Sequence, residues 1–193
     1  EFGTGVMTIT PWHSHEDFQL AEKYKLDVII RITGDCPIVS YEMAEFLLQK
    51  HFEKGNDYTG PKEYCAGQNS EVYNVNTMKR IMEYLGDARH SEYMTWYMIT
   101  NKDIFQVDMH DLPKEWIRTY RLTLDVQEDL DMFNALFEKL GKKEISIKNV
   151  FDVIDKEPWI HELNDAMVFK YKSDKKLIDM LNKETKINLR KVK

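Results

Sequence analysis

The sequence feature that most constrains the fold is the apolar run "DVIIRITGDCPIV" at residues 27–39. Four of its first six residues are branched aliphatics, a composition typical of a short strand buried within a sheet. The run ends in turn formers, because Gly34 frees the backbone and Pro37 removes the N–H that a continuing strand would need. We therefore predict a strand over residues 27–33, with Asp35 just beyond its carboxyl end.

Strand-like and helix-like segments alternate along the chain. Besides 27–33, we predict strands at 71–75, 104–109 and 119–125, a loop at 57–70, a helix from Ser40 to Gly55, and helices at 14–25, 77–85, 90–101, 129–140, 146–156 and 175–181. The helix at 129–140 has the clearest pattern, with one apolar face formed by Leu130, Phe133, Phe137 and Leu140. Helices placed between strands predict an α/β domain around a largely parallel, buried sheet. In open sheets of this kind ligands bind beyond the carboxyl ends of the strands, which is where Asp35 lies.

Charge is distributed unevenly along the 193 residues. The chain carries a formal charge of −6, yet residues 170–193 hold nine Lys or Arg against three Asp or Glu. The body is therefore strongly acidic, which argues against nucleic-acid binding because phosphate contacts need a basic surface. The basic tail has three open interpretations: it docks on a partner, it docks on its own acidic body, or it is a solvated tail with one helix. We predict an irregular N-terminus or tag at 1–13, an α/β domain at 14–165 and a basic tail at 166–193.

Cysteine content and hydropathy bear on location. The two cysteines, Cys36 and Cys65, form no C-x-x-C pair, so a disulfide framework is not expected. No apolar run approaches the roughly 20 residues that span a bilayer, and no secretory leader is recognisable. We therefore expect a cytoplasmic protein without membrane insertion.

A second acidic strand end lies in "YRLTLDVQEDLDMF", where Asp125 follows an alternating segment and Glu128 comes three residues later. One interpretation is structural: Asp125 caps the following helix and Glu128 completes a capping box. The other is functional: Asp125 and Asp35 face one crevice, where a divalent cation offsets their repulsion. Arg31 and Arg121 each precede one of these acids by four residues, an even spacing that puts Arg and Asp on the same face of a regular strand.

Both segments resemble a known family. "RITGDCPIV" and "YRLTLDVQEDLDMFNALFEKL" are similar to the paired Asp motifs of the cytidylyltransferase-like family that includes the spore-coat polysaccharide synthesis protein SpsF, and which is related to the CMP-KDO and CMP-sialic acid synthetases. The resemblance runs in order from about Asp17 to Asn164, and it includes "SEVYNVNTMKRI", "ARHSEYMTWYMITN" and "PWIHELN".

The resemblance implies a Rossmann-like, three-layer α/β/α fold of the nucleotide-diphospho-sugar transferase type. It also implies a Mg²⁺-dependent transfer of a nucleotidyl group from CTP to an acidic sugar or sugar phosphate, in cell-surface polysaccharide biosynthesis. By matching position, Asp35 and Asp125 would be catalytic and hold Mg²⁺. Substrate contacts are expected from Arg31, Thr33, Gly34, Glu71, His90 and Arg121. Related synthetases are commonly dimers, so a homodimer is expected.

One family motif has no counterpart. The family begins with a strand and a triphosphate-binding loop of the form Ala-Arg-x-Gly-Ser-x-Arg-[Leu/Phe]-Pro-x-Lys, whereas this sequence opens with "EFGTGVMTITPWHSHEDF". The sequence thus predicts a domain truncated at its N-terminus, and it leaves the question of enzymatic activity open. The alternative is a non-catalytic or degenerate α/β homologue, a sugar-binding or oligomerisation module that uses the aromatic helix of Tyr93, Trp96 and Tyr97.

Overall fold

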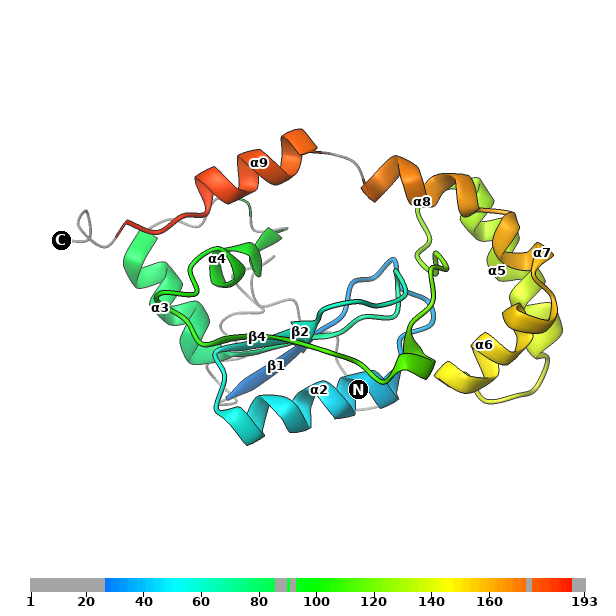
Figure 1. The fold of residues 1–193 in the computed structure, drawn as a ribbon, viewed down its shortest axis with the longest axis horizontal. Helices are drawn as coiled ribbons and strands as arrows, with labels where there is room; N and C mark the ends of the chain where they lie inside the picture. Colours follow the sequence, from blue (N-terminus) through cyan, green and yellow to red (C-terminus); the bar gives the residue numbers. More distant parts are fainter. Residues whose placement is uncertain (1–26, 86–89, 91–92, 173–174, 189–193) are drawn as a thin grey trace, which may run out of the picture.

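The computed structural model describes residues 27–85, 90, 93–172 and 175–188, and the side chains of these residues except 169–172. The irregular segment at 1–13 and the helix predicted at 14–25 lie outside the described residues. In chain order the elements are β1 (Val28–Arg31), α2 (Tyr41–Lys54), β2 (Tyr58–Pro61), β3 (Glu71–Asn74), α3 (Val75–Leu85), α4 (Trp96–Ile99), β4 (Val107–His110), the 3₁₀ turn η2 (Lys114–Trp116), α5 (Gln127–Leu140), α6 (Ile147–Lys156), α7 (Trp159–Glu162), α8 (Asp165–Lys172) and α9 (Lys175–Glu184) (Figure 1). Among these helices, none has the length and apolar character needed to cross a membrane.

The sheet has the strand order β1-β3-β2-β4. Strand β3 is antiparallel to both of its neighbours, and β2 pairs in parallel with β4. Three strands therefore point in one direction, while the reversed strand β3 lies between two of them. The predicted α/β class is confirmed. Three of the four described strands run parallel to one another, and the sheet is mixed because β3 makes two of the three strand pairings antiparallel.

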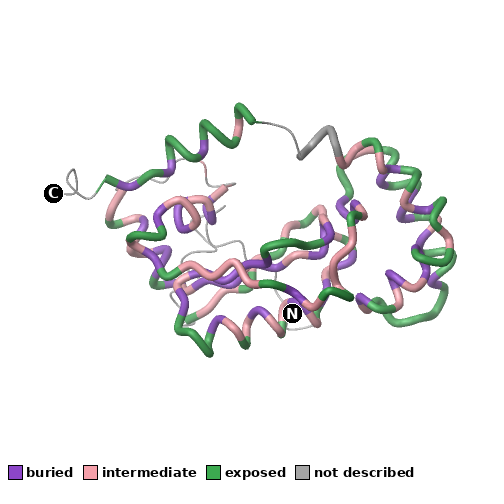
Figure 2. The backbone as a smooth tube through the Cα atoms, in the orientation of Figure 1, coloured by how far each residue is buried: buried purple, intermediate pink, exposed green. Residues whose placement is uncertain are grey.

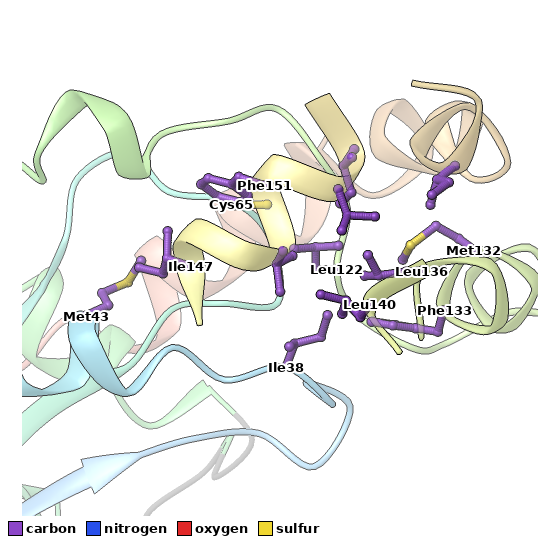
Figure 3. Close-up of a cluster of buried hydrophobic side chains, with 14 of the residues drawn as sticks. Ile38, Met43, Cys65, Leu122, Met132, Phe133, Leu136, Leu140, Ile147 and Phe151 are labelled. Atoms are coloured by element: carbon purple, nitrogen blue, oxygen red, sulfur yellow. The ribbon is translucent and has the colours of Figure 1, made fainter. Parts of the chain in front are cut away.

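Two hydrophobic clusters cover the two faces of this sheet. Successive residues of a strand point to opposite faces, and accordingly Val72 belongs to one cluster and Tyr73 to the other. The first cluster joins the sheet to α2, α5 and α6 through side chains that include Met43, Leu136 and Phe151 (Figure 3). The second is formed by residues of β2, β3, α3 and α4, the loop before β4, and the C-terminal segment: Tyr58, Tyr73, Met78, Ile81, Met94, Tyr97, Met98, Phe105 and Ile187. The result is a layered α/β/α arrangement.

Local capping signals set the ends of helix α2, as predicted. The Ser40 hydroxyl accepts a hydrogen bond from the Met43 N–H at 3.0 Å, which satisfies one of the unpaired donors of the first turn. Gly55 ends the helix with φ of 64°, a left-handed conformation that glycine adopts without a Cβ clash.

Three predicted elements are wrong. The loop predicted at 57–70 contains strand β2, all four residues of which are buried. The strand predicted at 119–125 is an extended segment with a single bridge, from Arg121 to Ala66. The helix predicted at 90–101 is reduced, among its described residues, to α4.

The apolar face predicted for α5 is only half correct. Phe133 and Leu140 are buried, but Leu130 and Phe137 are exposed, and the buried stripe passes instead through Asp129, Met132 and Leu136. Helix α5 carries apolar residues on more than one side, so periodicity alone could not select the buried one.

The C-terminal segment is anchored on the body of the protein. Asn101 is fully buried, and both polar atoms of its side-chain amide bind the C-terminal segment. Its Nδ2 donates to the Thr185 carbonyl at 2.9 Å, and its Oδ1 accepts from the Ile187 N–H at 2.9 Å. Leu181 is also buried, although most of α9 is exposed (Figure 2). Of the three interpretations of the basic tail, the structure therefore supports docking on its own body for residues 181–187.

Candidate active site

The two predicted metal-binding acids lie together. The Thr123 hydroxyl lies 2.8 Å from Asp35 Oδ2 and 3.2 Å from Asp125 Oδ2. The separation of these two carboxylate oxygens therefore cannot exceed the sum of the two distances. The backbone also joins the segments, because the Leu124 N–H donates to the Asp35 carbonyl at 2.8 Å. The two acids, 90 positions apart in the sequence, thus share one hydroxyl.

The segment that carries Thr123 is held in place by the loop after β2. Cys65 Sγ donates to the Tyr120 carbonyl at 3.1 Å, and the Leu122 N–H donates to the Ala66 carbonyl at 2.7 Å. Gly67 has φ of 89°, and a Cβ at this position would lie 1.9 Å from the Leu122 carbonyl oxygen. Only glycine permits this approach, which brings the loop against the acid-bearing segment.

A buried network holds Asp125. Arg121, 5% exposed, donates from Nη2 to Asp125 Oδ2 at 2.6 Å and to Asp129 Oδ2 at 2.8 Å, and from Nε to Asp129 Oδ1 at 2.9 Å. Asp129 is fully buried and also accepts hydrogen bonds from the N–H groups of Asp125 and Val126. Asn164 Nδ2 donates to Asp129 Oδ1 at 2.8 Å and to the Arg121 carbonyl at 3.0 Å.

This network overturns the capping interpretation of Asp125 and Glu128. Helix α5 begins at Gln127 with Val126 as its N-cap, so Asp125 lies one residue before the cap. The acid at the third helical position is Asp129, and its carboxylate receives the N–H of Val126 at 3.2 Å. Valine has no side-chain acceptor to complete a reciprocal pair.

Arg31 and Glu71 face each other across strands β1 and β3 and form an ion pair of 2.7 Å. The other Glu71 oxygen accepts from the Tyr58 hydroxyl at 2.7 Å. Burial and the adjacent Glu71 carboxylate together raise the pKa of Tyr58, so this phenol stays protonated and acts as a donor. Two residues predicted to bind substrate therefore also bind one another.

A cavity of about 580 Å³ lies over these groups. Six of the predicted site residues line it: Arg31, Thr33, Gly34, Asp35, Glu71 and Asp125. Its remaining lining residues are Ile32, Tyr64, Asn69, Tyr93, Thr95 and Trp96. Arg121 is not among the lining residues of this cavity, but it donates a hydrogen bond to Asp125, which is. His90 does not line it and instead contacts Glu184 at 2.5 Å.

Several residues of the site were not predicted. Thr123 carried a usable signal, because it lies two residues before Asp125 and so shares its face in an extended segment. Asp129 and Asn164 had none, since their roles depend on contacts 8 and 35 positions apart in the sequence. The aromatic helix is not an exposed surface: Tyr97 is 2% exposed, and Trp96 Nε1 donates to Asn182 of α9 at 3.0 Å.

The electrostatics of the cavity suit a divalent cation. Its described lining holds one guanidinium against the carboxylates of Asp35, Glu71 and Asp125. Burial alone raises the pKa of Asp35, but hydrogen bonds from Thr33 and Thr123 and the charge of Arg31 outweigh it and hold that pKa below its usual value. Burial raises the pKa of the Cys36 thiol, which is half-buried beside Asp35.

The donor set also fits magnesium. Mg²⁺ prefers oxygen ligands and is usually bound by one or two carboxylates, with water and substrate phosphate completing its coordination. Asp35 and Asp125 provide two such carboxylates in the lining of the cavity. Among the described residues, no cluster of three or more His, Cys, Asp or Glu is arranged to hold a metal unaided.

The structure thus combines a layered α/β/α fold with two acids, Asp35 and Asp125, that meet beside a cavity. The family model described as "Cytidylyltransferase" matches residues 14–178, and the chain belongs to this family. It is 31% identical over 143 residues to the spore coat polysaccharide biosynthesis protein SpsF of Bacillus subtilis, covering 72% of this chain and 60% of that protein. It is 29% identical over 153 residues to an uncharacterized protein of Methanocaldococcus jannaschii, covering 76% of this chain and 61% of that protein.

A solved structure supports the fold. A cytidylyltransferase from Leptospira borgpetersenii superposes with a TM-score of 0.65 at 22% sequence identity, over 76% of this chain and 63% of that one. At this identity the likeness establishes the Rossmann-like fold. The chain spans about three fifths of the length of the relatives it matches.

Proposed function

We propose that this chain carries the acid-bearing part of the active site of a sugar cytidylyltransferase of polysaccharide biosynthesis. The observation that supports this most directly is the convergence of Asp35 and Asp125, which both line a cavity, on the Thr123 hydroxyl. The family supports CTP as nucleotide donor, and the name of the Bacillus subtilis relative supports a role in polysaccharide biosynthesis. An acidic or phosphorylated sugar as acceptor is part of the proposal.

In the proposed reaction an acceptor oxygen forms a bond to the α-phosphorus of CTP, the bond to the β-phosphate oxygen breaks, and pyrophosphate leaves. Asp35 and Asp125 would hold Mg²⁺, which neutralises phosphate charge and orients the reacting oxygens. Asp35 is ready for this role because its lowered pKa keeps it ionised at neutral pH. The Thr123 hydroxyl lies within hydrogen-bond distance of both carboxylates and has one hydrogen to donate between them. The Asp125 side chain, 37% exposed, stays open to the cavity.

The test is isothermal titration of the chain with CTP, with and without Mg²⁺. We expect binding that depends on Mg²⁺, and a loss of at least about tenfold in Asp35→Asn, because a charge-assisted contact is removed. Thr123→Val, which keeps side-chain shape and removes the hydroxyl, should weaken binding less. Asp152→Asn on the exposed side of α6 is the charge-matched control and should bind like the wild type.

Two results would contradict the proposal. One is the absence of Mg²⁺-dependent CTP binding in a folded wild-type chain. The other is an Asp35→Asn variant that binds as tightly as its Asp152→Asn control. Pyrophosphate release with acidic, phosphorylated and neutral sugars, measured on any preparation that binds CTP, tests the acceptor class.

A further inference from the structure

The guanidinium of Arg121 lies between two carboxylates of unlike exposure. Asp129 on one side is completely buried, whereas the Asp125 side chain on the other is 37% exposed and lines the cavity. Asp129 accepts from two nitrogens of the guanidinium, Nε at 2.9 Å and Nη2 at 2.8 Å, and Asp125 Oδ2 accepts from Nη2 at 2.6 Å. The two-point contact with Asp129 orients the planar guanidinium, and the contact with Asp125 depends on that orientation.

We propose that Asp129 is a positioning residue that neutralises Arg121, so that Arg121 fixes the place of Asp125 without cancelling its charge. This inference rests on the proposed function, in which Asp125 holds a divalent cation. Arg121, Asp125 and Asp129 together carry a charge of −1, which remains available on the exposed member. If Asp129 were neutral, Asp125 would be the only acid bonded to the arginine and the three residues would have no net charge.

The surrounding contacts favour this division of roles. The Asp129 carboxylate accepts the N–H groups of Asp125 and Val126 and one Asn164 hydrogen, so five hydrogen bonds hold it in place. A carboxylate so enclosed by protein donors has no position for an added ligand. Asp125, by contrast, opens on the cavity.

The test is Mn²⁺ binding by the intact chain, measured from the paramagnetic resonance signal of free Mn²⁺ in the absence of nucleotide. Asp129→Asn keeps the shape of the side chain and removes its charge, and it should weaken Mn²⁺ binding by about tenfold or more, because a unit charge near a divalent ion at a partly exposed site contributes on that order. Asp131→Asn, an exposed residue on the same helix, makes the same change in total charge and should leave the affinity unchanged.

A double variant separates charge from fold. Asp129→Asn combined with Arg121→Gln removes both charges of the buried pair and restores a net charge of −1 on Asp125. It should bind Mn²⁺ more tightly than Asp129→Asn and within about threefold of the wild type, since the charge that attracts the ion is back. The remaining loss reflects the bond from Arg121 that no longer places Asp125. A purely structural role for Asp129 predicts the opposite, because the double variant loses still more of the network. The double variant also decides the question if Asp129→Asn alone fails to fold.

The outcomes are distinct. If the wild type binds Mn²⁺ and Asp129→Asn binds equally well, or if the double variant binds as weakly as Asp129→Asn or as weakly as Asp35→Asn, the positioning role is overturned and the proposed function stands. If the folded wild type binds no Mn²⁺, both the metal site and this inference are overturned.

Discussion

Replacing Gly67 by alanine tests whether the loop after β2 sets the geometry of the acid pair. Two separate penalties follow from the structure at this position. The first is conformational, because φ of 89° is unfavourable for any residue with a Cβ. The second is steric, because the new Cβ would lie 1.9 Å from the Leu122 carbonyl oxygen and 2.6 Å from the Thr123 nitrogen, both of them backbone atoms.

Gly55→Ala is a matched control that carries only the first penalty. Gly55 has φ of 64°, and a Cβ there would meet nothing within 4 Å. Forcing a left-handed conformation costs about 1–2 kcal/mol, and the reduced entropy of the unfolded chain returns roughly half of it, so Gly55→Ala should lower the free energy of unfolding by about 1 kcal/mol. Gly67→Ala must in addition separate the two backbones and lose the Leu122–Ala66 hydrogen bond, for a total of about 3 kcal/mol or more.

Urea denaturation followed by tryptophan fluorescence gives both free energies of unfolding. The affinity for Mn²⁺ should fall in Gly67→Ala, because the displaced segment carries Thr123 and Asp125, and should be unchanged in Gly55→Ala. A difference in unfolding free energy of less than about 1 kcal/mol between the two variants, with equal Mn²⁺ affinity, would refute the reasoning, since strain alone accounts for a cost of that size.

Three further predictions concern stability. Leu136→Ala, at a completely buried site, should lower the free energy of unfolding by about 3 kcal/mol through the cavity it creates, whereas Leu130→Ala, 41% exposed on the same helix, should cost less than about 1 kcal/mol in the same urea titration. Burial raises the pKa of Asp129, but hydrogen bonds from Arg121, the Asp125 N–H and Asn164 outweigh it and lower that pKa in the folded state. The stability that this shift contributes is therefore present above the ordinary pKa of 3.8 and is lost as pH falls below it. Asp129→Asn should flatten this loss of stability at acid pH in unfolding curves measured from pH 7 to 2. Asn101→Ala removes both bonds to the C-terminal segment and should speed hydrogen exchange at Ile187 while leaving exchange in β3 unchanged.

The sequence predicted those features that depend on neighbouring residues. Ser40 and Gly55 define the ends of α2 because capping and left-handed termination are local chemistry. Strand β2 was missed because Gly60 and Pro61 are turn formers in isolation, and pairing with β3 and with β4, almost 50 residues later, makes "YTGP" a strand. The reverse error occurred at 119–125, where a period-two pattern is typical of a strand but only Arg121 forms a bridge.

The candidate site shows the same division. The two acids could be predicted because each follows its strand-like segment directly. The meeting of Asp35 with the Thr123 hydroxyl, the bond between Asp129 and Asn164, and the glycine approach at Gly67 could not, since each is defined by a contact between distant segments. The spacing of four residues between arginine and acid was a correct signal for Arg121, which contacts Asp125 at 2.6 Å.

The two arginines show why this cavity remains acidic. Arg31 lies four residues before Asp35 and Arg121 four residues before Asp125, and each is bonded to a further acid, Arg31 to Glu71 and Arg121 to Asp129. An arginine beside a lone carboxylate would cancel the charge that a cation needs, whereas an arginine already matched by another acid orients its neighbour and leaves that charge in place. The same logic therefore applies to both halves of the site: Glu71→Gln should weaken Mn²⁺ binding as Asp129→Asn does. The two effects should add when the variants are combined, because the Arg31–Glu71 and Arg121–Asp129 pairs lie on separate elements.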